Sequence, residues 1–595
     1  MEGCRGIPSG TRETATAQFM PVHNADIARV FEEIADLLDI GEANPFRIRA
    51  YRNAARTVAE LQLELAAALA KGEALPKLPG IGEDLAAKIR EVSETGSCAL
   101  LQRLRRELPP AVTELLHIPG LGPKRVRTLW HELEVQTLEQ LARAARDGRI
   151  RALPGFGPRL EAQVLETIGR QQSKSRRFKL ALAAQYAQGY VSWLRGTAAA
   201  GRVEVAGSFR RMRETVGDLD ILVTARDARA VIGRFTGYGE VAQVVSAGAT
   251  RAAVLLRSGL GVDLRVVADE SYGAALHYFT GSKAHNIAVR RLGQARGLKI
   301  SEYGVFRGEK RIAGETEESV YRAVGLPYIP PELREDRGEI EAAREGRLPR
   351  LVELGDLQGD LHVHTTWSDG HHSIADMARA AARRGLHYIA VTEHSRRLAV
   401  ARGLDPARLR KQAREIERVN GEGGSARVLT GIEVDILPDG SLDLPESALA
   451  GLDVVIGAVH SRFDLPRARQ TERVLAALDA PRLHILAHPS GRLIDQREPY
   501  DIDMAAVIRK AAARGAALEV NAHPERLDLL DTYCRAARDA GVLVAINSDA
   551  HSEMEFDNLR FGVGQARRGW IEARDCLNTR SLAELRRWLA RTRRP

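Results

Sequence analysis

The feature that most constrains the fold is residues 207–222, GSFRRMRETVGDLDIL, which set two acids inside an apolar run. Asp218 and Asp220 lie two positions apart in VGDLDILVT, a run that predicts a β-strand, and the strand period of two points both carboxylates to one face. Adjacent carboxylates repel unless a cation lies between them, and Mg²⁺ prefers hard oxygen ligands shared with substrate phosphates. The pattern predicts a metal-binding strand; the alternative is a surface strand with two solvated acids.

The turn before this strand carries groups suited to a phosphate. Gly207 and Ser208 offer backbone N–H groups and a hydroxyl, and Arg210 and Arg211 add positive charge. Phosphate-binding groups beside a pair of metal-binding acids indicate nucleotidyl transfer.

Three similar phrases punctuate the helical region that precedes this strand. They are LPGIGEDLAAKI at 78–89, IPGLGPKRVRTL at 118–129 and LPGFGPRLEAQV at 153–164. Each resembles the helix-hairpin-helix motif, whose glycines let backbone amides approach a DNA phosphate without reading base sequence. The resemblance assigns DNA contacts to Gly80, Gly82, Gly120, Gly122, Gly155 and Gly157. A plain helix–helix connection is the alternative for any one phrase, most of all for the third.

Histidine marks the last part of the chain as a metal-binding region, because 11 of the 16 histidines follow residue 355. Short apolar strands alternate there with Ala/Arg-rich helices, as in HYIAVTEH, DVVIGAVH and VLVAINSDAH. Such repeats predict a parallel α/β barrel. The candidate ligands fall at or just after strand ends, where barrel active sites lie.

This candidate set contains six histidines and three carboxylates: His362, His364, Asp369, His394, Glu433, His460, His488, Asp549 and His551. The first two form an H-x-H pair on one strand face, which is a common imidazole pair for Zn, Mn or Fe. Nine ligands exceed the needs of one ion and favour a cluster of two or three ions bridged by a carboxylate.

The set resembles the PHP phosphoesterase domain over nearly all of residues 355–575, with every ligand position of that pattern present. The resemblance implies two to three Mn, Zn or Fe ions and hydrolysis of phosphate esters by a metal-bound hydroxide. Glu393 stands where Asp is commoner, at a position that is not a ligand. Four histidines also lie outside the ligand pattern: His371, His372, His484 and His523. A degenerate, purely structural PHP domain is the alternative, although such domains normally lack several ligands.

Residues from about 22 to 330 resemble a family X DNA polymerase at three separated motifs: GSFRR…GDLD, GVDLR at 261–265 and YFTGSKAHNIAVR at 278–290. The resemblance implies that Asp218, Asp220 and Asp263 hold two Mg or Mn ions for an in-line displacement. It assigns nucleotide and template contacts to Gly207, Ser208, Arg211, Gly217, Tyr278, Phe279, Gly281, Asn286 and Arg290. Within that set, Ser208 and Arg211 are expected to bind the β and γ phosphates, and Tyr278 and Phe279 the sugar.

Three positions depart from the pattern of relatives. Val216 and Lys283 replace a serine near the phosphates and an acid that faces the base, so both put the details of nucleotide affinity in question. Lys88 aligns with the Schiff-base lysine of relatives with deoxyribose-phosphate lyase activity, but Asp84 replaces a supporting lysine. Lys88 is therefore a candidate lyase residue, with an ordinary solvated helix lysine as the alternative.

Together these segments predict a multidomain α/β protein. It would combine N-terminal helix-hairpin-helix domains, an α+β nucleotidyltransferase palm with a thumb, and a distorted (β/α)7-type PHP barrel. The expected divisions are 1–19 (disordered tail or mis-assigned start), 20–105 (lyase-like helical domain), 106–172 (helical fingers), 173–270 (palm), 271–330 (thumb), 331–354 (linker), 355–575 (PHP domain) and 576–595 (C-terminal helix or tail).

Composition excludes several classes of protein. There is no apolar run near 18 residues and no apolar signal core, so we expect no membrane span and a cytoplasmic location. The four cysteines, at 4, 98, 534 and 576, are scattered, which argues against a disulfide framework and fits a reducing compartment. The formal charge of +9 is compatible with nucleic acid without establishing it.

The combined expectation is a bacterial-type family X DNA polymerase that fills short gaps in base-excision repair. Its PHP domain would act as a 3′–5′ exonuclease and at abasic sites. The expected partners are gapped or primed double-stranded DNA and deoxynucleoside triphosphates, and the expected state is a monomer. The alternatives are a histidinol-phosphatase-type enzyme with a DNA-binding front half, a non-catalytic DNA scaffold and a template-independent transferase. The intact palm acids argue against the first two.

Overall fold

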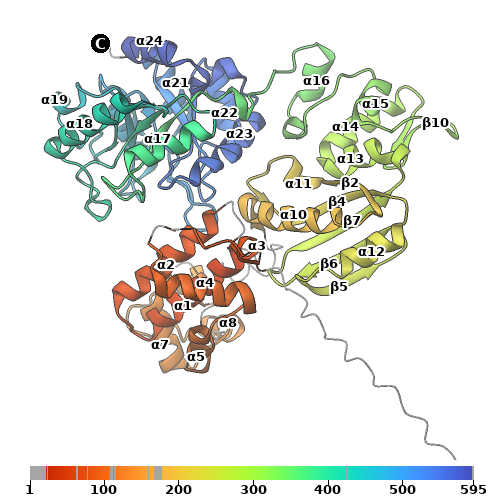
Figure 1. Cartoon of the computed structure of the whole chain (residues 1–595), viewed down its shortest axis with the longest axis horizontal. Coiled ribbons are helices and arrows are strands. Elements are labelled where there is room, and N and C mark those ends of the chain that lie inside the picture. Colours follow the sequence, from red (N-terminus) through yellow and green to blue (C-terminus); the bar gives the residue numbers. More distant parts are fainter. Residues whose placement is uncertain are drawn as a thin grey trace, which may run out of the picture.

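The computed structural model describes residues 22–592, apart from 23, 62–64, 71, 77, 79, 108–111, 113–114, 119, 159, 166–176 and 424. The expectation for residues 1–19 lies outside the described residues. In Figure 1 the chain runs from red helices, through a yellow palm and a green thumb, to a blue-green barrel.

The N-terminal region is helical. Its first unit contains α1 (Asn24–Ile40), α2 (Pro45–Glu60), α3 (Leu65–Ala70), α4 (Glu83–Thr95) and α5 (Ala99–Glu107). Helix α2 begins where the Asn44 side chain accepts a hydrogen bond from the Phe46 amide and where Pro45 supplies a helical φ. Helix α4 ends at Gly96 in the left-handed conformation. The apolar faces of these helices share one core.

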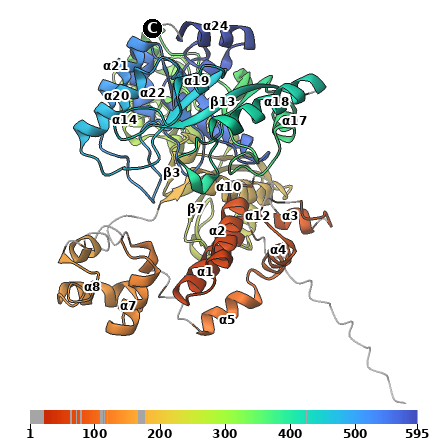
Figure 2. The same cartoon turned by 90° about the vertical axis from the view of Figure 1, so that its left-hand side faces the viewer.

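A second helical unit follows, formed by η1 (Leu115–His117), α7 (Pro123–Leu133) and α8 (Leu138–Arg146). A capping box between Thr137 and Gln140 starts α8. Ile40, at the end of α1, joins the core of this unit, and Figure 2 shows α7 beside α1.

The palm is a five-stranded sheet in the order β2-β4-β7-β6-β5. Its strands are β2 (Ala200–Val205), β4 (Asp218–Ala225), β5 (Val241–Ala247), β6 (Arg251–Leu256) and β7 (Gly261–Val267), and its helices are α10 (Leu180–Arg195), α11 (Gly207–Arg210) and α12 (Ala228–Thr236). Strands β4 and β7 are parallel, and the other neighbouring pairs are antiparallel. Alternate residues of β4, namely Leu219, Ile221 and Val223, face the core beneath α10 and α12. The period of two therefore places Asp218 and Asp220 on the opposite face.

The thumb follows directly. It contains η2 (Asp269–Ser271), α13 (Tyr272–Thr280), α14 (Lys283–Gln294), α15 (Glu317–Ala323) and an antiparallel sheet of β8 (Lys299–Ser301), β9 (Gly304–Arg307) and β10 (Lys310–Ala313). Ala275 and Leu276 of α13 cluster with Leu222 of β4, so α13 covers the acid-bearing face of the palm sheet.

Residues 331–354, expected from composition as a linker, fold into η3 (Pro331–Leu333), α16 (Glu339–Arg344) and η4 (Leu354–Asp356). Leu333 and Ile340 are buried in a cluster with Tyr321 of the thumb and Trp570 of the barrel. The few apolar residues of this polar segment thus tie the two halves together.

The C-terminal part is a sheet of seven parallel strands in sequence order, within the described part of the chain. They are β11 (Gly359–Val363), β12 (Tyr388–Val391), β13 (Arg427–Asp435), β14 (Val454–Ala458), β15 (Ile485–Leu486), β16 (Ala517–Asn521) and β17 (Val544–Asn547). A parallel bridge between Val363 and Ala550 brings the last strand back beside the first, so the sheet forms a nearly closed barrel. The predicted fold class is confirmed.

The helices around the barrel are α17 (Ile374–Arg383), α18 (Pro406–Glu422), α19 (Glu446–Leu449), α20 (Arg467–Leu478), α21 (Met504–Arg514), α22 (Asp531–Asp539), α23 (Leu559–Arg568) and α24 (Leu582–Thr592). Inward residues such as Leu361 and Leu429 form the barrel interior, into which α24 packs Leu585 and Leu589. Across residues 22–592, gaps aside, no helix is both long and apolar enough to cross a bilayer.

The palm and the barrel are in direct contact. Ile494, Leu527 and Phe561 of the barrel are buried in the palm core. Around them, Arg492 pairs with Glu214 at 2.7 Å, and Lys179 pairs with Glu525. The palm therefore packs on two barrel loops, 490–497 and 523–527.

Candidate functional sites

The three palm acids lie on neighbouring strands. Asp220 of β4 is in register with Asp263 of β7, and Asp218 lies two residues before Asp220. Burial and the charges of Asp218 and Asp263 raise the pKa of Asp220 to about 7, and burial and Asp263 raise the pKa of Asp218. The described groups whose ligand atoms all lie within 4.8 Å of one another do not include this trio. Mutual repulsion keeps the palm acids spaced, and divalent cations would relieve it.

The turn before β4 passes close to these acids. Gly207 has φ +64°, and a Cβ added there would lie 2.3 Å from Oδ2 of Asp220. The Ala206 amide donates to the Asp220 carbonyl at 2.7 Å. Only glycine therefore allows the turn to lie against the carboxylate. Ser208 and Gly217 flank the same acids from α11 and from the start of β4.

Both arginines of this turn, Arg210 and Arg211, pair with residues that follow the palm in the chain. Arg210 forms a bidentate pair with Glu317, at 2.9 and 2.7 Å. Burial opposes ionisation of Glu317, but Arg334 and Arg210 lower its pKa to about 2. Arg211 donates to Glu335 at 3.1 Å and to the Thr280 carbonyl. Arg210 is thus a structural tie, which the motif alone did not show.

A barrel arginine shares the carboxylate that holds Arg211. Arg568 donates to Glu335 at 2.9 Å, to the Arg211 carbonyl at 2.7 Å and to Asp531 at 2.7 Å. Its side chain is only 2% exposed. The palm turn, the end of the thumb and α23 are therefore joined in one network of buried charges.

The thumb residues gather beside the palm. Tyr278 and Phe279 make an edge contact at 5.1 Å between ring centroids, with Arg290 over the Tyr278 ring. Asn286 donates to the Tyr278 carbonyl at 2.7 Å, while its Oδ1 is buried without a hydrogen bond. Gly281, with φ +70°, places the turn between α13 and α14 against Arg211.

The three glycine phrases adopt one local geometry. Gly80, Gly120 and Gly155 have φ values of +69°, +89° and +81°. Gly82 and Gly122 are N-caps of α4 and α7 without a side-chain cap. At Gly80, Gly82, Gly122, Gly155 and Gly157 an added Cβ would meet no atom within 4 Å. The third phrase therefore shares the local glycine conformation of the first two.

Lys88 lies on α4 beside Asp84. Its Nζ is 2.5 Å from Oδ1 of Asp84. Burial alone would lower the pKa of Lys88, but Asp84 and Tyr51 raise it. This environment favours the charged ammonium over the neutral amine that Schiff-base chemistry needs.

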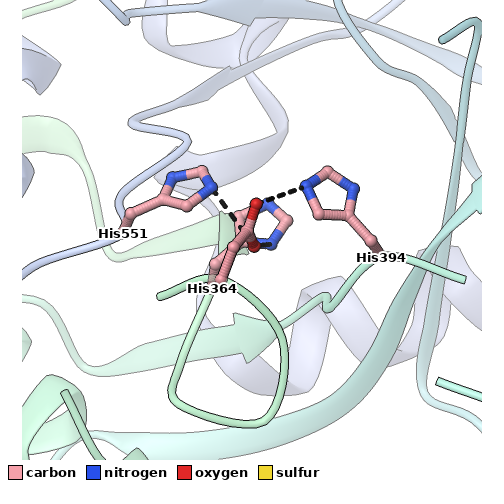
Figure 3. Close-up of side chains that lie close together, drawn as sticks. His364, His394 and His551 are labelled. Atoms are coloured by element: carbon pink, nitrogen blue, oxygen red, sulfur yellow. Dashed lines mark ion pairs between the residues drawn. The ribbon is translucent and has the colours of Figure 1, made fainter. Parts of the chain in front are cut away.

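The structure brings all nine expected barrel ligands together at the carboxyl ends of the strands. Asp369, His364, His394 and His551 form one group of possible ligands, His362, His364 and Asp549 a second, and His394, Glu433 and His460 a third. Figure 3 shows His364, His394 and His551 converging on one carboxylate. The first group shares His364 with the second and His394 with the third, so the three groups form one continuous cluster.

Two carboxylates lie at the centre of this cluster. Glu433 lies 3.0 Å from Nε2 of His488, 3.2 Å from Nε2 of His460 and 3.6 Å from Nε2 of His362. Oδ1 of Asp549 is 3.3 Å from Nε2 of both His362 and His364. Each carboxylate therefore lies close to several of the candidate imidazole ligands.

The donor atoms of the cluster fit divalent metal ions. His362 Nε2, both ring nitrogens of His364, His488 Nδ1 and Glu433 Oε2 are buried and make no hydrogen bond. Burial and the neighbouring histidines lower the pKa of His364 to about 4, which favours the neutral imidazole that binds metal. Convergent buried ligand atoms without other partners are what a multi-metal site requires.

Two buried acids outside the expected ligand set support these ligands, and one of them, Glu519, was not singled out by the sequence. Glu519 of β16 accepts from Nδ1 of His362 at 2.7 Å and from the His488 amide at 2.8 Å. Glu393 accepts from Thr365 and Ser368, and so fixes the loop that carries Asp369. Glu519 stands in an apolar strand without a motif around it, so only its position behind His362 identifies it.

The histidines expected to lack a ligand role are placed elsewhere. His484 lies at the start of β15, accepts from the Val455 amide and approaches Trp588 of α24. His523 accepts from the Glu525 amide. Neither belongs to the described groups of possible metal ligands, and the same holds for His371 and His372.

The fold and these two sites define a class of protein: a DNA polymerase β-type core with helix-hairpin-helix units, joined to a PHP barrel. Family models match in that order: a helix-hairpin-helix domain at 22–98, a SAM-like helix-hairpin-helix tandem at 112–170, the DNA polymerase beta thumb at 275–335 and the PHP domain at 360–548.

Comparison with individual proteins identifies the family. The chain is 38% identical, over 96% of its length and all of the relative, to the DNA polymerase/3′-5′ exonuclease PolX of Bacillus subtilis. A probable phosphatase of Edwardsiella ictaluri is 34% identical over 34% of this chain and 81% of its own, within the PHP portion. DNA polymerase lambda of Rattus norvegicus is 27% identical over 43% of this chain and 48% of its own. The chain belongs to the PolX family.

Proposed function

We propose that this chain is a DNA polymerase that fills short gaps in double-stranded DNA, and that its barrel removes nucleotides from 3′ ends. The observation that carries the proposal is the coexistence of two complete ligand sets in one chain: three acids on β4 and β7 and nine ligands at the barrel strand ends. The full-length relative whose printed name gives both activities supports the same combination. Short-gap filling suits base-excision repair.

In the palm, Asp218, Asp220 and Asp263 would hold two Mg or Mn ions, which supply charge neutralisation when bound. Asp263, in register with Asp220 on the neighbouring strand, would help take up the proton of the primer 3′-hydroxyl. Ser208 and Arg211 would bind the β and γ phosphates of a deoxynucleoside triphosphate, in a turn that Gly207 allows to lie against the acids. Arg211 must first exchange Glu335 for phosphate.

The thumb would complete the nucleotide pocket. Tyr278 and Phe279 present an aromatic edge to the sugar, and Gly281 keeps the turn narrow. The buried, unpartnered Oδ1 of Asn286 is available for a base-pair edge, and Arg290 for the template. The glycine turns would hold the DNA backbone through their amides.

In the barrel, the nine ligands would hold two to three Mn, Zn or Fe ions, which supply Lewis acidity and an activated water when bound. Glu519 orients His362 by accepting its Nδ1 proton, so that Nε2 points into the cluster. Glu433 and Asp549 bring negative charge between the imidazoles. These residues favour hydrolysis of a phosphodiester at a DNA end, with abasic-site cleavage as a related reaction of the same site.

We further propose that the enzyme acts as a monomer in the cytoplasm, on DNA. The buried cysteines Cys98, Cys534 and Cys576 are free, which suits a reducing compartment. The competing proposal, a phosphatase with an inert DNA-binding front half, does not account for the palm acids.

Primer extension on a one-nucleotide gap, with Mg²⁺ or Mn²⁺, tests the proposal. Asp218→Ala with Asp220→Ala should abolish extension and leave 3′ trimming intact. His362→Ala with His364→Ala should do the reverse. Asp269→Ala, which removes an exposed acid at the start of the thumb paired with Arg202, is the matched control and should change neither activity. Extension that survives the palm double substitution would refute the polymerase assignment.

We propose Lys88 as a lyase residue on one condition: its side chain must first lose a proton and become the neutral amine. Borohydride trapping on an abasic 5′-flap should give a weak adduct that disappears in Lys88→Ala and grows in Asp84→Asn, since Asp84 holds the ammonium. An adduct that persists in Lys88→Ala would place the chemistry elsewhere.

A further inference from the structure

An arginine at the edge of the barrel cluster has an unused donor. Arg526 lies in the loop between β16 and α22, with Nε 3.8 Å from Oδ2 of Asp549 and a side chain that is 19% exposed. Its Nη1 is buried and makes no hydrogen bond. A buried guanidinium nitrogen without a partner is costly, and native structures rarely keep one without a reason.

Arg473, a fully buried arginine of the barrel, behaves differently. Arg473 donates from Nε to the Ile436 and Leu437 carbonyls, from Nη1 to Ser461 and from Nη2 to Ile436. Its fork is saturated by backbone carbonyls, as expected of a structural arginine. Arg526 also has a buried guanidinium nitrogen, but that nitrogen makes no hydrogen bond. Arg526 therefore lacks the set of backbone partners that holds Arg473 as a structural arginine.

The backbone of Arg526 is firmly held. Arg492 donates to the Arg526 carbonyl at 2.8 Å and to the Leu527 carbonyl, and the Ile494 amide donates to the Glu525 carbonyl at 2.7 Å. Arg492 is itself paired with Glu214 of the palm. Two barrel loops and the palm therefore hold the backbone that carries the guanidinium.

Asp549 is not a sufficient partner for this charge. Its Oδ2 accepts from Asn521 at 3.0 Å, and its Oδ1 faces His362 and His364 at 3.3 Å. The 3.8 Å approach of Arg526 is an ion pair without a hydrogen bond. In the proposed function Asp549 gives its charge to metal ions, which leaves Arg526 as a cation facing the same cluster.

We propose that Arg526 binds a non-bridging oxygen of the phosphodiester that enters the barrel site. A guanidinium matches phosphate oxygens in a planar, charge-assisted fork. The proposal rests on the proposed phosphodiester hydrolysis by the barrel, and adds a substrate-binding residue from a loop that the palm secures.

The test uses the full-length chain and a single-stranded primer with Mn²⁺. Arg526→Ala should lower kcat/KM for 3′ trimming about 10- to 100-fold, the loss expected for one charged hydrogen-bonding group. Arg526→Lys should recover part of the loss, because it keeps the charge but not the fork. The inhibition constant of inorganic phosphate should rise in Arg526→Ala, which reports anion binding without turnover.

Two measurements separate this role from a structural one. Metal content by mass spectrometry and gap filling should both stay at wild-type values in Arg526→Ala. Arg535→Ala, which removes a half-buried barrel arginine stacked on Trp570, is the matched control and should trim normally. Lost metal, or unchanged trimming and phosphate inhibition, would overturn the inference. If the wild type and His362→Ala with His364→Ala trim equally, the proposed function itself has failed.

Discussion

The two metal centres of this chain differ in how charge is arranged. The palm site contains three carboxylates of one sign on neighbouring strands, and burial together with the charges of Asp218 and Asp263 raises the pKa of Asp220. The barrel site interleaves histidines and carboxylates in a buried cluster with nitrogen–oxygen distances of 2.6 to 3.8 Å around Glu433. The palm must therefore be assembled by its ions and nucleotide, whereas the barrel is largely preorganised by its own ion pairs.

The largest expected effect comes from removing the central charge of the barrel. Burial opposes ionisation of Glu433, but His460, His394 and His362 hold its pKa well below the usual range. Glu433→Gln should abolish trimming. It should also lower the free energy of unfolding of the metal-free chain by about 3–5 kcal/mol at neutral pH, the cost of leaving buried partners uncompensated. Chemical denaturation in a chelator measures this, and an unchanged midpoint would contradict preorganisation.

A residue behind the ligands should have a smaller effect. Glu519→Gln keeps the shape but loses the charge that orients His362, so metal affinity or trimming should fall about 10- to 100-fold. Gap filling should be unaffected. Metal titration followed by trimming rates checks this, and Asp376→Asn is a control that should change neither, since Asp376 lies in the first turn of the outer helix α17 and accepts from its N-cap Ser373.

In the palm, replacing an acid by its amide should raise the free energy of unfolding of the metal-free chain, whereas in the barrel it should lower it. The folded-state pKa of Asp220 lies above that of an unfolded chain, so its carboxyl costs stability that grows as pH rises from about 4 to 7. In a chelator, Asp220→Asn should therefore be more stable than wild type, by up to about 4 kcal/mol at pH 8, since about three pKa units separate the folded and unfolded carboxyl, and by less at pH 5. Equal stability at both pH values would show that the pKa of Asp220 is not raised in the folded chain. Gap filling should be lost.

The smallest expected effect concerns the carboxylate that occupies Arg211. Glu335→Gln should free Arg211 and lower the KM for the nucleotide severalfold with little change in kcat. Arg568→Ala removes one competitor for Glu335, which then pairs with Arg211 and, at 4.0 Å, with Arg213, and should raise that KM. Steady-state gap filling with both variants gives the comparison; a KM that rises in both would indicate a merely structural network.

Much of this arrangement follows from sequence, and its limits have a physical basis. The barrel ligands lie at strand ends, and the alternation in β4 places Asp218 and Asp220 on one face. Local sequence pattern was therefore enough to predict which residues share each site. The roles of Glu519, Arg526 and Arg210 depend on partners far away in the chain, such as Glu317 for Arg210. The packing of residues 331–354 against Trp570, and of Glu214 against Arg492, is likewise invisible to local periodicity.

The central claim is that one chain contains two separate chemistries, one adding and one removing nucleotides. The most direct measurement is a time course on gapped DNA whose primer ends in one mispaired nucleotide. The wild type should trim the mispair and then fill the gap. Asp218→Ala with Asp220→Ala should stop at the trimmed primer, and His362→Ala with His364→Ala should leave the mispair in place. If either double substitution removed both steps in a folded, DNA-binding chain, or if both steps survived it, the account would be contradicted.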